Sequence, residues 1–287
     1  MRSRNAATLH APAACRAVRC AWSSTILAGA LAMLLTGCSG TLSAPTAPMP
    51  ARPAAQQPPI PQADRVDLSG LPEATTFGDL IGGVPDPEPQ RDTDGVVLHI
   101  EQPVAVHDRP GGSAFAKLPA TQLGNPTWVP VIARSGAWAQ VLLPSRPNGT
   151  SGWIRVTAAD PVRQARSPFR VEVDVEAKRL AVWRGAERLG EWTVGVGAAE
   201  SPTPRGRTFV MAAVEEQVTR FSPIILPLGT HSETFNSYGG GPGTVALHGW
   251  PGDEVFGKAI SDGCVRVPPD ALQLLSTLPL GTVVLLR

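Results

Sequence analysis

The chain has 287 residues, with 25 basic and 24 acidic side chains and a formal net charge of +1. This balance gives no reason to expect a nucleic-acid partner. The 30 prolines and 29 glycines are too many for compact structure along the whole length, so one or two small domains beside unstructured segments are expected.

Residues 1–37 have the pattern of a targeting segment. They carry four arginines and no acidic residue, and an apolar stretch at 26–35 is too short to span a bilayer, which takes about 20 residues. The stretch ends in Leu35-Thr36-Gly37-Cys38, which resembles the lipobox of bacterial lipoproteins. That resemblance implies a removed signal peptide and a lipid on Cys38. It also implies an exported protein, anchored in the cell membrane and facing the cell wall. An ordinary secretory signal or an uncleaved anchor is the alternative.

The positions of the four cysteines leave one candidate for a reactive thiol in the folded part of the chain. Cys15 and Cys20 lie in the predicted leader, and Cys38 would carry lipid, which leaves Cys264 for the folded part. An exported protein with one remaining cysteine cannot form an internal disulfide. The thiol of Cys264 is therefore either a buried bystander or a reactive group.

Two segments precede the last unit of the chain. Residues 38–94 are rich in proline and alanine without sustained apolar periodicity, which predicts a disordered tether. Residues 95–162 contain short β-rich runs separated by Gly, Pro and Asn, which predict a small β-barrel. Their layout resembles bacterial SH3-like domains. The expected strands are Val96–Ile100, Trp128–Ala133, Trp138–Leu143 and Trp153–Val156.

Residues 169–287 are expected to form a second β-rich domain with one or two short helices. Valines at 171, 173 and 175 alternate with acidic residues, as in a half-buried strand, and a hairpin is expected near Gly185. One helix is predicted from Asp270 to Leu278, after Pro268-Pro269. The chain as a whole is thus predicted to be mainly β. Further strands are expected at 208–212, 244–247 and 282–286.

The candidate catalytic residues lie in two short segments, His248-Gly249-Trp250 and 261–266. Sixteen positions separate His248 from Cys264. A free cysteine is only slightly ionised at neutral pH, so thiol chemistry needs a base such as an imidazole. Gly263 permits unusual backbone angles beside the thiol, and Arg266 offers a planar fork for a carboxylate. Each residue alone is more often structural: a lone Cys is usually a small buried hydrophobe.

The stretch from Thr244 to Gly249, together with Ser261-Asp262-Gly263-Cys264-Val265-Arg266, resembles the catalytic signature of the L,D-transpeptidases. The segment 201–209 matches that family's Thr-Pro-x-Gly region, and 238–243 resembles its glycine-rich loop. The resemblance covers the whole of 169–287. It implies a β-rich catalytic domain.

The resemblance also implies a reaction. Cys264 would attack the amide before the terminal D-Ala of a peptidoglycan tetrapeptide, and the thioester would pass to an amine of a second stem. The crosslink would join third-position residues. His248 would be base and then acid, oriented by the carbonyl of Gly249, with the N–H groups of Gly263 and Cys264 serving the oxyanion. Carbapenem-type inhibitors are expected to acylate the thiol, and no metal or cofactor is expected. Contacts to the stem peptides are expected from Ser261, Asp262, Arg266, Trp250, His231 and Tyr238.

Asp262 departs from the family pattern, which most often has His or Asn there. It would raise the pKa of the thiol, or pair with Arg266, or steer a cationic acceptor amine, and pairing is the favoured expectation. His231 is a reserve candidate for the base or for a contact from a lid, and the lid is favoured. Two rival functions remain: an L,D-carboxypeptidase using the same thioester, and a non-catalytic wall-binding lipoprotein.

Overall fold

The computed structural model describes residues 66–215, 221–237 and 241–287. The predicted signal peptide, Cys38 and the first part of the expected tether lie outside these residues, as does Tyr238. The described residues belong to one compact unit. The part of the chain that is described is mainly β with a single α-helix, so the predicted fold class is confirmed.

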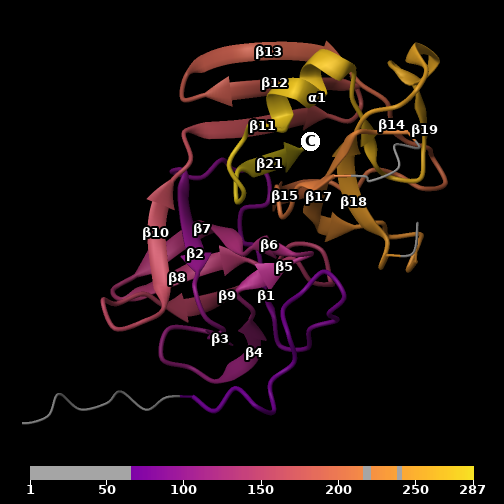
Figure 1. Cartoon of the computed structure of the whole chain (residues 1–287). Helices are drawn as coiled ribbons and strands as arrows, with labels where there is room; N and C mark the ends of the chain where they lie inside the picture. Colours follow the sequence, from indigo (N-terminus) through magenta and orange to yellow (C-terminus); the bar gives the residue numbers. More distant parts are fainter. Residues whose placement is uncertain (1–65, 216–220, 238–240) are drawn as a thin grey trace, which may run out of the picture. The chain divides into compact units, whose positions relative to one another are not determined.

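The first sheet occupies the region of the predicted barrel, and its strands run in the order β10-β2-β7-β8-β9-β3-β4, with β1 paired to β9 (Figure 1). Strand β8 is buried on both faces, because residues 139–142 are all buried. The SH3-like assignment remains a prediction. The strands are β1 Val84–Pro85, β2 Val96–Ile100, β3 Val104–His107, β4 Ala114–Leu118, β7 Trp128–Ser135, β8 Trp138–Leu142, β9 Thr150–Arg155 and β10 Val162–Arg166, with β5 Thr121–Gln122 and β6 Asn125–Pro126 as a separate pair.

The C-terminal part holds a five-stranded sheet of order β13-β12-β11-β21-β15 and a four-stranded sheet of order β16-β17-β18-β20. Their valines and leucines share one core with helix α1, Pro269–Leu275. The strands are β11 Phe169–Asp174, β12 Arg179–Arg184, β13 Glu187–Thr193, β15 Gly206–Phe209, β16 Val214–Glu215, β17 Ile224–His231, β18 Thr244–His248, β20 Val265–Arg266 and β21 Val283–Leu286, with β14 Val196–Gly197 and β19 Ala259–Ser261 as a parallel pair and a 3-10 turn at Asp253–Val255.

Helix α1 begins at Pro269, one residue before its predicted start, and the missing N–H of a proline costs nothing in the first turn. It ends at Leu275, three residues before the predicted end. Pro279 follows closely, and the residue before a proline is disfavoured in helical conformation. Ala271, Leu272 and Leu275 are its buried residues, and they fix the helix on the core. No helix in the described ranges is both long and apolar enough to cross a bilayer.

The prediction of a tether through residue 94 is wrong for the described residues of that segment. Ala74 is fully buried and Leu80 is nearly so, and both pack in the core of the first sheet. Asp86 forms a buried ion pair with Arg207 of β15, with oxygen–nitrogen distances of 2.6 and 2.9 Å. These ordering contacts are made with distant residues, so local composition does not reveal them.

Candidate active site

Two adjacent strands bring His248 and Cys264 together. β18 and β20 are parallel, with Leu247 opposite Val265 and His248 opposite Arg266. Continued by one residue, this register places Cys264 opposite Ala246, and the thiol has a hydrogen bond with the backbone of Ala246. Side chains two residues apart on a strand share a face. The side chains at 246, 248, 264 and 266 therefore lie on one face of the sheet.

The ring of His248 is held in one orientation. Its Nδ1 donates a hydrogen bond to the carbonyl oxygen of Gly249 at 2.7 Å, which leaves Nε2 as the ring nitrogen able to accept a proton. The backbone N–H of Gly249 in turn donates to Ser222 Oγ at 2.8 Å. Phe221 packs edge-on against the imidazole, with ring centroids 5.0 Å apart. The imidazole of His248 is therefore held in one orientation at the end of a strand, as its predicted role as base requires.

A tight turn presents Cys264. Gly263 has φ +114°, a conformation that favours glycine. Ser261 Oγ donates to the carbonyl oxygen of Cys264 at 2.5 Å and accepts from the N–H of Gly263 at 3.2 Å. Ser261 is buried and its hydroxyl shapes the turn, while its expected contact with substrate stays a prediction. The N–H of Gly263 is likewise bonded within the turn, which argues against its expected role in stabilising an oxyanion.

The segment 201–203 supports this turn from outside. Ser201 Oγ donates to the carbonyl oxygen of Ser261 at 3.0 Å, and Thr203 Oγ1 donates to that of Gly263 at 2.9 Å. The C=O and N–H of a trans peptide point in opposite directions. The N–H of Cys264 consequently points away from Thr203, and it is the remaining backbone donor beside the thiol for an oxyanion.

The surroundings of the thiol favour its neutral form. Burial raises the pKa of Cys264, whereas the backbone hydrogen bond with Ala246 and the charge of Arg266 lower it, and the charge of Asp262 raises it. Burial dominates, so the thiol rests protonated at neutral pH. Any attack by its sulfur then requires a neighbouring group that accepts the proton.

Arg266 is a buried cation to which no described residue supplies an anionic partner. Its residue is 9% exposed, and Nε has no hydrogen-bond partner among the described residues. The guanidinium lies over the ring of Trp250, 3.6 Å from the ring centroid. Stacking on an aromatic face compensates part of the charge without using the in-plane N–H donors of the guanidinium. Such a group is suited to bind a carboxylate brought by a ligand.

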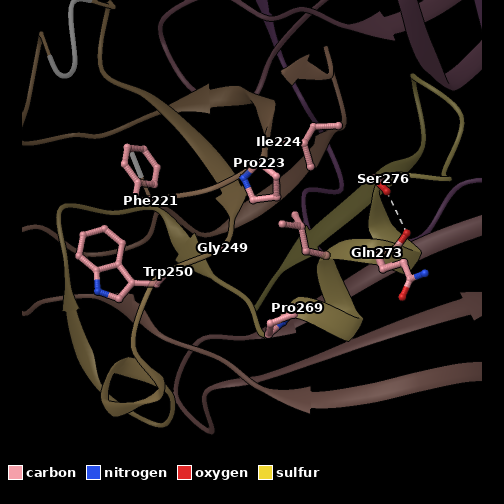
Figure 2. A pocket seen from close by; sticks show the side chains of 9 residues that line it. Phe221, Pro223, Ile224, Gly249, Trp250, Pro269, Gln273 and Ser276 are labelled. Atoms are coloured by element: carbon pink, nitrogen blue, oxygen red, sulfur yellow. Dashed lines mark hydrogen bonds between the residues drawn. The ribbon is translucent and has the colours of Figure 1, made fainter. Parts of the chain in front are cut away.

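A cavity of about 250 Å³ adjoins the turn that follows His248. Figure 2 shows Phe221 and Trp250 at one end of this cavity and Gln273 of α1 at the other, with Gly249 between them. Cys264 is not among the residues that line it. Trp250 therefore forms part of the wall of a cavity next to His248.

The structure does not support the roles expected for His231. The side chain is fully buried, and Nε2 donates to the carbonyl oxygen of Thr76 at 2.7 Å. His231 pairs with Thr244, at the other end of β18 from His248. Four residues of strand separate these positions by about 13 Å. His231 is therefore neither a second base nor a lid contact, and burial lowers its pKa to about 4.

The expected ion pair between Asp262 and Arg266 is also absent from the described residues. Asp262 is exposed in the turn before Gly263, whereas Arg266 points inward from β20 and stacks on Trp250. One side chain is exposed and the other is buried against Trp250, so the two do not meet. The carboxylate therefore remains available to solvent or to a ligand beside the thiol.

Several supporting residues were not identified from the sequence. Ser222 carries no motif, and Ser201 and Thr203 were recognised as part of a matching segment but not as supports of the nucleophile turn. Within the described ranges, no group of three His, Cys, Asp or Glu side chains is placed to hold a metal ion.

Comparisons with known proteins agree on one family. A sequence model of the YkuD family, described as the L,D-transpeptidase catalytic domain, matches residues 168–286. The Bacillus subtilis (strain 168) protein YqjB, an L,D-transpeptidase by name, is 30% identical over 122 residues, which are 40% of this chain and 69% of that protein. The protein YkuD of Bacillus licheniformis, also an L,D-transpeptidase by name, is 25% identical over 148 residues, or 50% and 82%.

Solved structures give weaker likenesses. The catalytic domain of the E. faecium L,D-transpeptidase aligns with a TM-score of 0.33 and 21% identity, covering 41% of this chain and 95% of that one. An L,D-transpeptidase from Mycobacterium smegmatis aligns with a TM-score of 0.36 and 15% identity, covering 55% and 82%.

Proposed function

The chain belongs to the L,D-transpeptidase family, and on that premise we propose that it crosslinks peptidoglycan stem peptides, with Cys264 as nucleophile and His248 as base. The observation that carries the proposal is the parallel pairing of β18 with β20, which mounts both side chains on one face of a sheet. The bond from Nδ1 to Gly249 adds the fixed tautomer that a base at this position needs.

In the first half of the reaction, Nε2 of His248 takes the thiol proton as the sulfur of Cys264 attacks the carbonyl carbon before the terminal D-Ala. The backbone N–H of Cys264 donates to the oxyanion that forms. The C–N bond then breaks, the proton passes from His248 to the leaving amine, and D-Ala departs from a thioester. In the second half an amine of another stem attacks the thioester. His248 accepts the amine proton and returns it to the sulfur, which restores the thiol.

Arg266 gives the proposal its substrate class. A buried guanidinium without an anionic partner is costly unless a ligand supplies the charge. A stem peptide carries carboxylates, and the planar fork of arginine binds a carboxylate through two parallel hydrogen bonds. We therefore assign Arg266 to a carboxylate of the donor stem, with Trp250 holding the guanidinium in place. Asp262, exposed beside the thiol, is suited to attract the cationic amine of the acceptor.

The proposal extends to residues outside the described ranges. Cys38 would carry lipid after removal of residues 1–37, which would anchor the protein in the cell membrane facing the wall. The first sheet would be an SH3-like module. A fatty-acid probe should label the wild type and leave Cys38→Ala unlabelled, and labelling of the variant would contradict the anchor.

The test of the reaction is incubation with purified disaccharide-tetrapeptide, with products read by mass. Release of D-Ala together with a dimer joined between third-position residues is expected, whereas D-Ala release without a dimer would indicate a carboxypeptidase. Cys264→Ser and His248→Ala should each lower acylation by several orders of magnitude, since about 10² to 10⁴ is typical of a general base alone. A carbapenem adduct on Cys264 would exclude the non-catalytic alternative.

A further inference from the structure

One arginine of the first sheet holds the connection between β17 and β18 at both of its ends. Arg146 follows β8, and its Nη1 donates to the carbonyl oxygen of Ser232 at 3.0 Å. Its Nη2 donates to those of Phe235 at 3.1 Å and Pro242 at 2.9 Å. Ser232 and Phe235 lie after β17, and Pro242 lies just before β18. A single planar guanidinium thus joins the chain leaving one strand to the chain entering the next.

The contact is built closely on both sides. The backbone of Arg146 is fixed by hydrogen bonds to Gly78 and Leu80, at 3.0 and 2.9 Å. A side chain on Gly243 would meet the carbonyl oxygen of Phe235 at 2.1 Å and Nη2 of Arg146 at 3.1 Å. Gly243 also has φ +75°. Only glycine fits this position, so the local backbone is matched to the approach of the arginine.

A second residue of the same loop reinforces the arrangement. Asn148 bonds both backbone groups of His231: its Oδ1 accepts from the N–H at 2.8 Å and its Nδ2 donates to the carbonyl at 2.7 Å. Thr76 Oγ1 then contacts Thr244 Oγ1 at 2.6 Å. The end of β17 and the start of β18 are therefore both fixed by residues that precede the C-terminal sheets in sequence.

The connection leads to the catalytic pair in two directions. It passes into β18, the strand that carries His248 and whose Ala246 bonds the thiol. It also reaches the turn of Cys264, because Thr234 Oγ1 donates to the carbonyl of Glu200 at 3.1 Å, and the next residue, Ser201, holds Ser261. A displacement of this connection would move both supports of the site.

We propose that Arg146 is a positioning residue of the active site, so that the first sheet takes part in placing the donor stem beside Cys264. The inference rests on the proposed function for its consequence in catalysis, but the contact itself does not depend on that function. Lysine would not replace the residue fully, because a compact ammonium cannot reproduce the fork that reaches three carbonyl oxygens in fixed directions.

The experiment compares Arg146→Gln and Arg146→Lys with wild type and with Arg109→Gln as control. Arg109 is an exposed arginine in the loop after β3, and among the described residues its side chain pairs with Asp108 alone. Three measurements are made on each purified protein: the kinetics of acylation by disaccharide-tetrapeptide, the rate of Cys264 alkylation by iodoacetamide, and hydrogen exchange in peptides covering 232–237 and 241–247. The melting temperature is recorded alongside.

Arg146→Gln should lower kcat/KM for tetrapeptide acylation about tenfold to a hundredfold, since misplacement by about 1 Å costs this much. Arg146→Lys should recover part of the loss, and Arg109→Gln should match wild type. Alkylation by the small reagent should fall much less than acylation, because iodoacetamide does not need a bound stem to be placed against Cys264. Exchange should increase in these two peptides and should stay unchanged in the strands of the first sheet.

The inference is overturned if tetrapeptide acylation by Arg146→Gln stays near wild type, or if alkylation and acylation fall together with the melting temperature. The latter pattern would show a role in stability only. Unchanged exchange at 232–237 and 241–247 would also overturn it. If wild type itself fails to react with tetrapeptide, the proposed function fails, while increased exchange in Arg146→Gln would still establish that the arginine holds the connection.

Discussion

Acid should lower the free energy of unfolding of this protein through protonation of His231, and the structure gives the size of the effect. Burial lowers the pKa of His231 from 6.5 to about 4; the bond to Thr76 opposes the shift, nearby Arg146 adds to it, and Asp79 opposes it. Nε2 donates to the Thr76 carbonyl, and Nδ1 has no hydrogen-bond partner among the described residues. A second proton on the ring would therefore bury both a charge and an unpaired N–H.

Between pH 6.5 and about 4 the unfolded chain binds a proton at His231 that the folded chain excludes. The stability that the neutral imidazole allows is thus fully present above pH 6.5, and it is lost as the pH falls towards 4. A pKa difference of about 2.5, at about 1.4 kcal/mol per pH unit, amounts to about 3.5 kcal/mol of unfolding free energy in full, of which about 3 kcal/mol is lost between pH 7 and pH 4.

The measurement is urea unfolding followed by tryptophan fluorescence at pH 7 and pH 4, on wild type and His231→Gln. Glutamine keeps an N–H donor for Thr76 and does not titrate, so the acid sensitivity of all other groups cancels in the comparison. Wild type should lose about 3 kcal/mol more than the variant between the two pH values. Equal losses would refute the assignment of a buried neutral imidazole.

Three further predictions follow from particular contacts. Asp86→Asn leaves a buried arginine unpaired and should cost about 3 to 5 kcal/mol in urea unfolding, whereas Glu88→Gln, at an exposed pair, should cost under about 1 kcal/mol. Asp262→Asn removes a charge that raises the pKa of Cys264, so the pH profile of alkylation should move downward, by less at high salt; an unmoved profile would mean that the carboxylate does not act on the thiol. Ser222→Ala unpairs the N–H of the turn after the proposed base and should lower stability by about 1 to 3 kcal/mol together with the acylation rate. An acylation rate equal to wild type would show that the turn does not orient the base.

The sequence was informative where structure depends on local pattern. β2 matches its predicted limits at both ends, and α1 begins one residue from its predicted start, because apolar periodicity and proline act within a few residues. β17 was missed, since Pro227 within an apolar run argues against an interior strand. The ordered structure of residues 71–94 and the burial of His231 depend on contacts with residues that are distant in sequence. No local pattern contains this information.

The pairing of β18 with β20 separates two requirements of such an enzyme: a fixed spacing of nucleophile and base, and a surface that selects the substrate. The offset between nucleophile and base is set by backbone hydrogen bonds between strands, and a strand slips only in whole residues. Of the fourteen residues from Trp250 to Gly263 that connect them, those of β19 are paired with β14, whereas residues 250–258 belong to no strand. Substitutions or insertions in the middle of this excursion should therefore alter which stems are accepted while leaving the spacing of sulfur and imidazole unchanged. Substrate preference in this architecture can diverge in a surface loop without any change in the reacting pair.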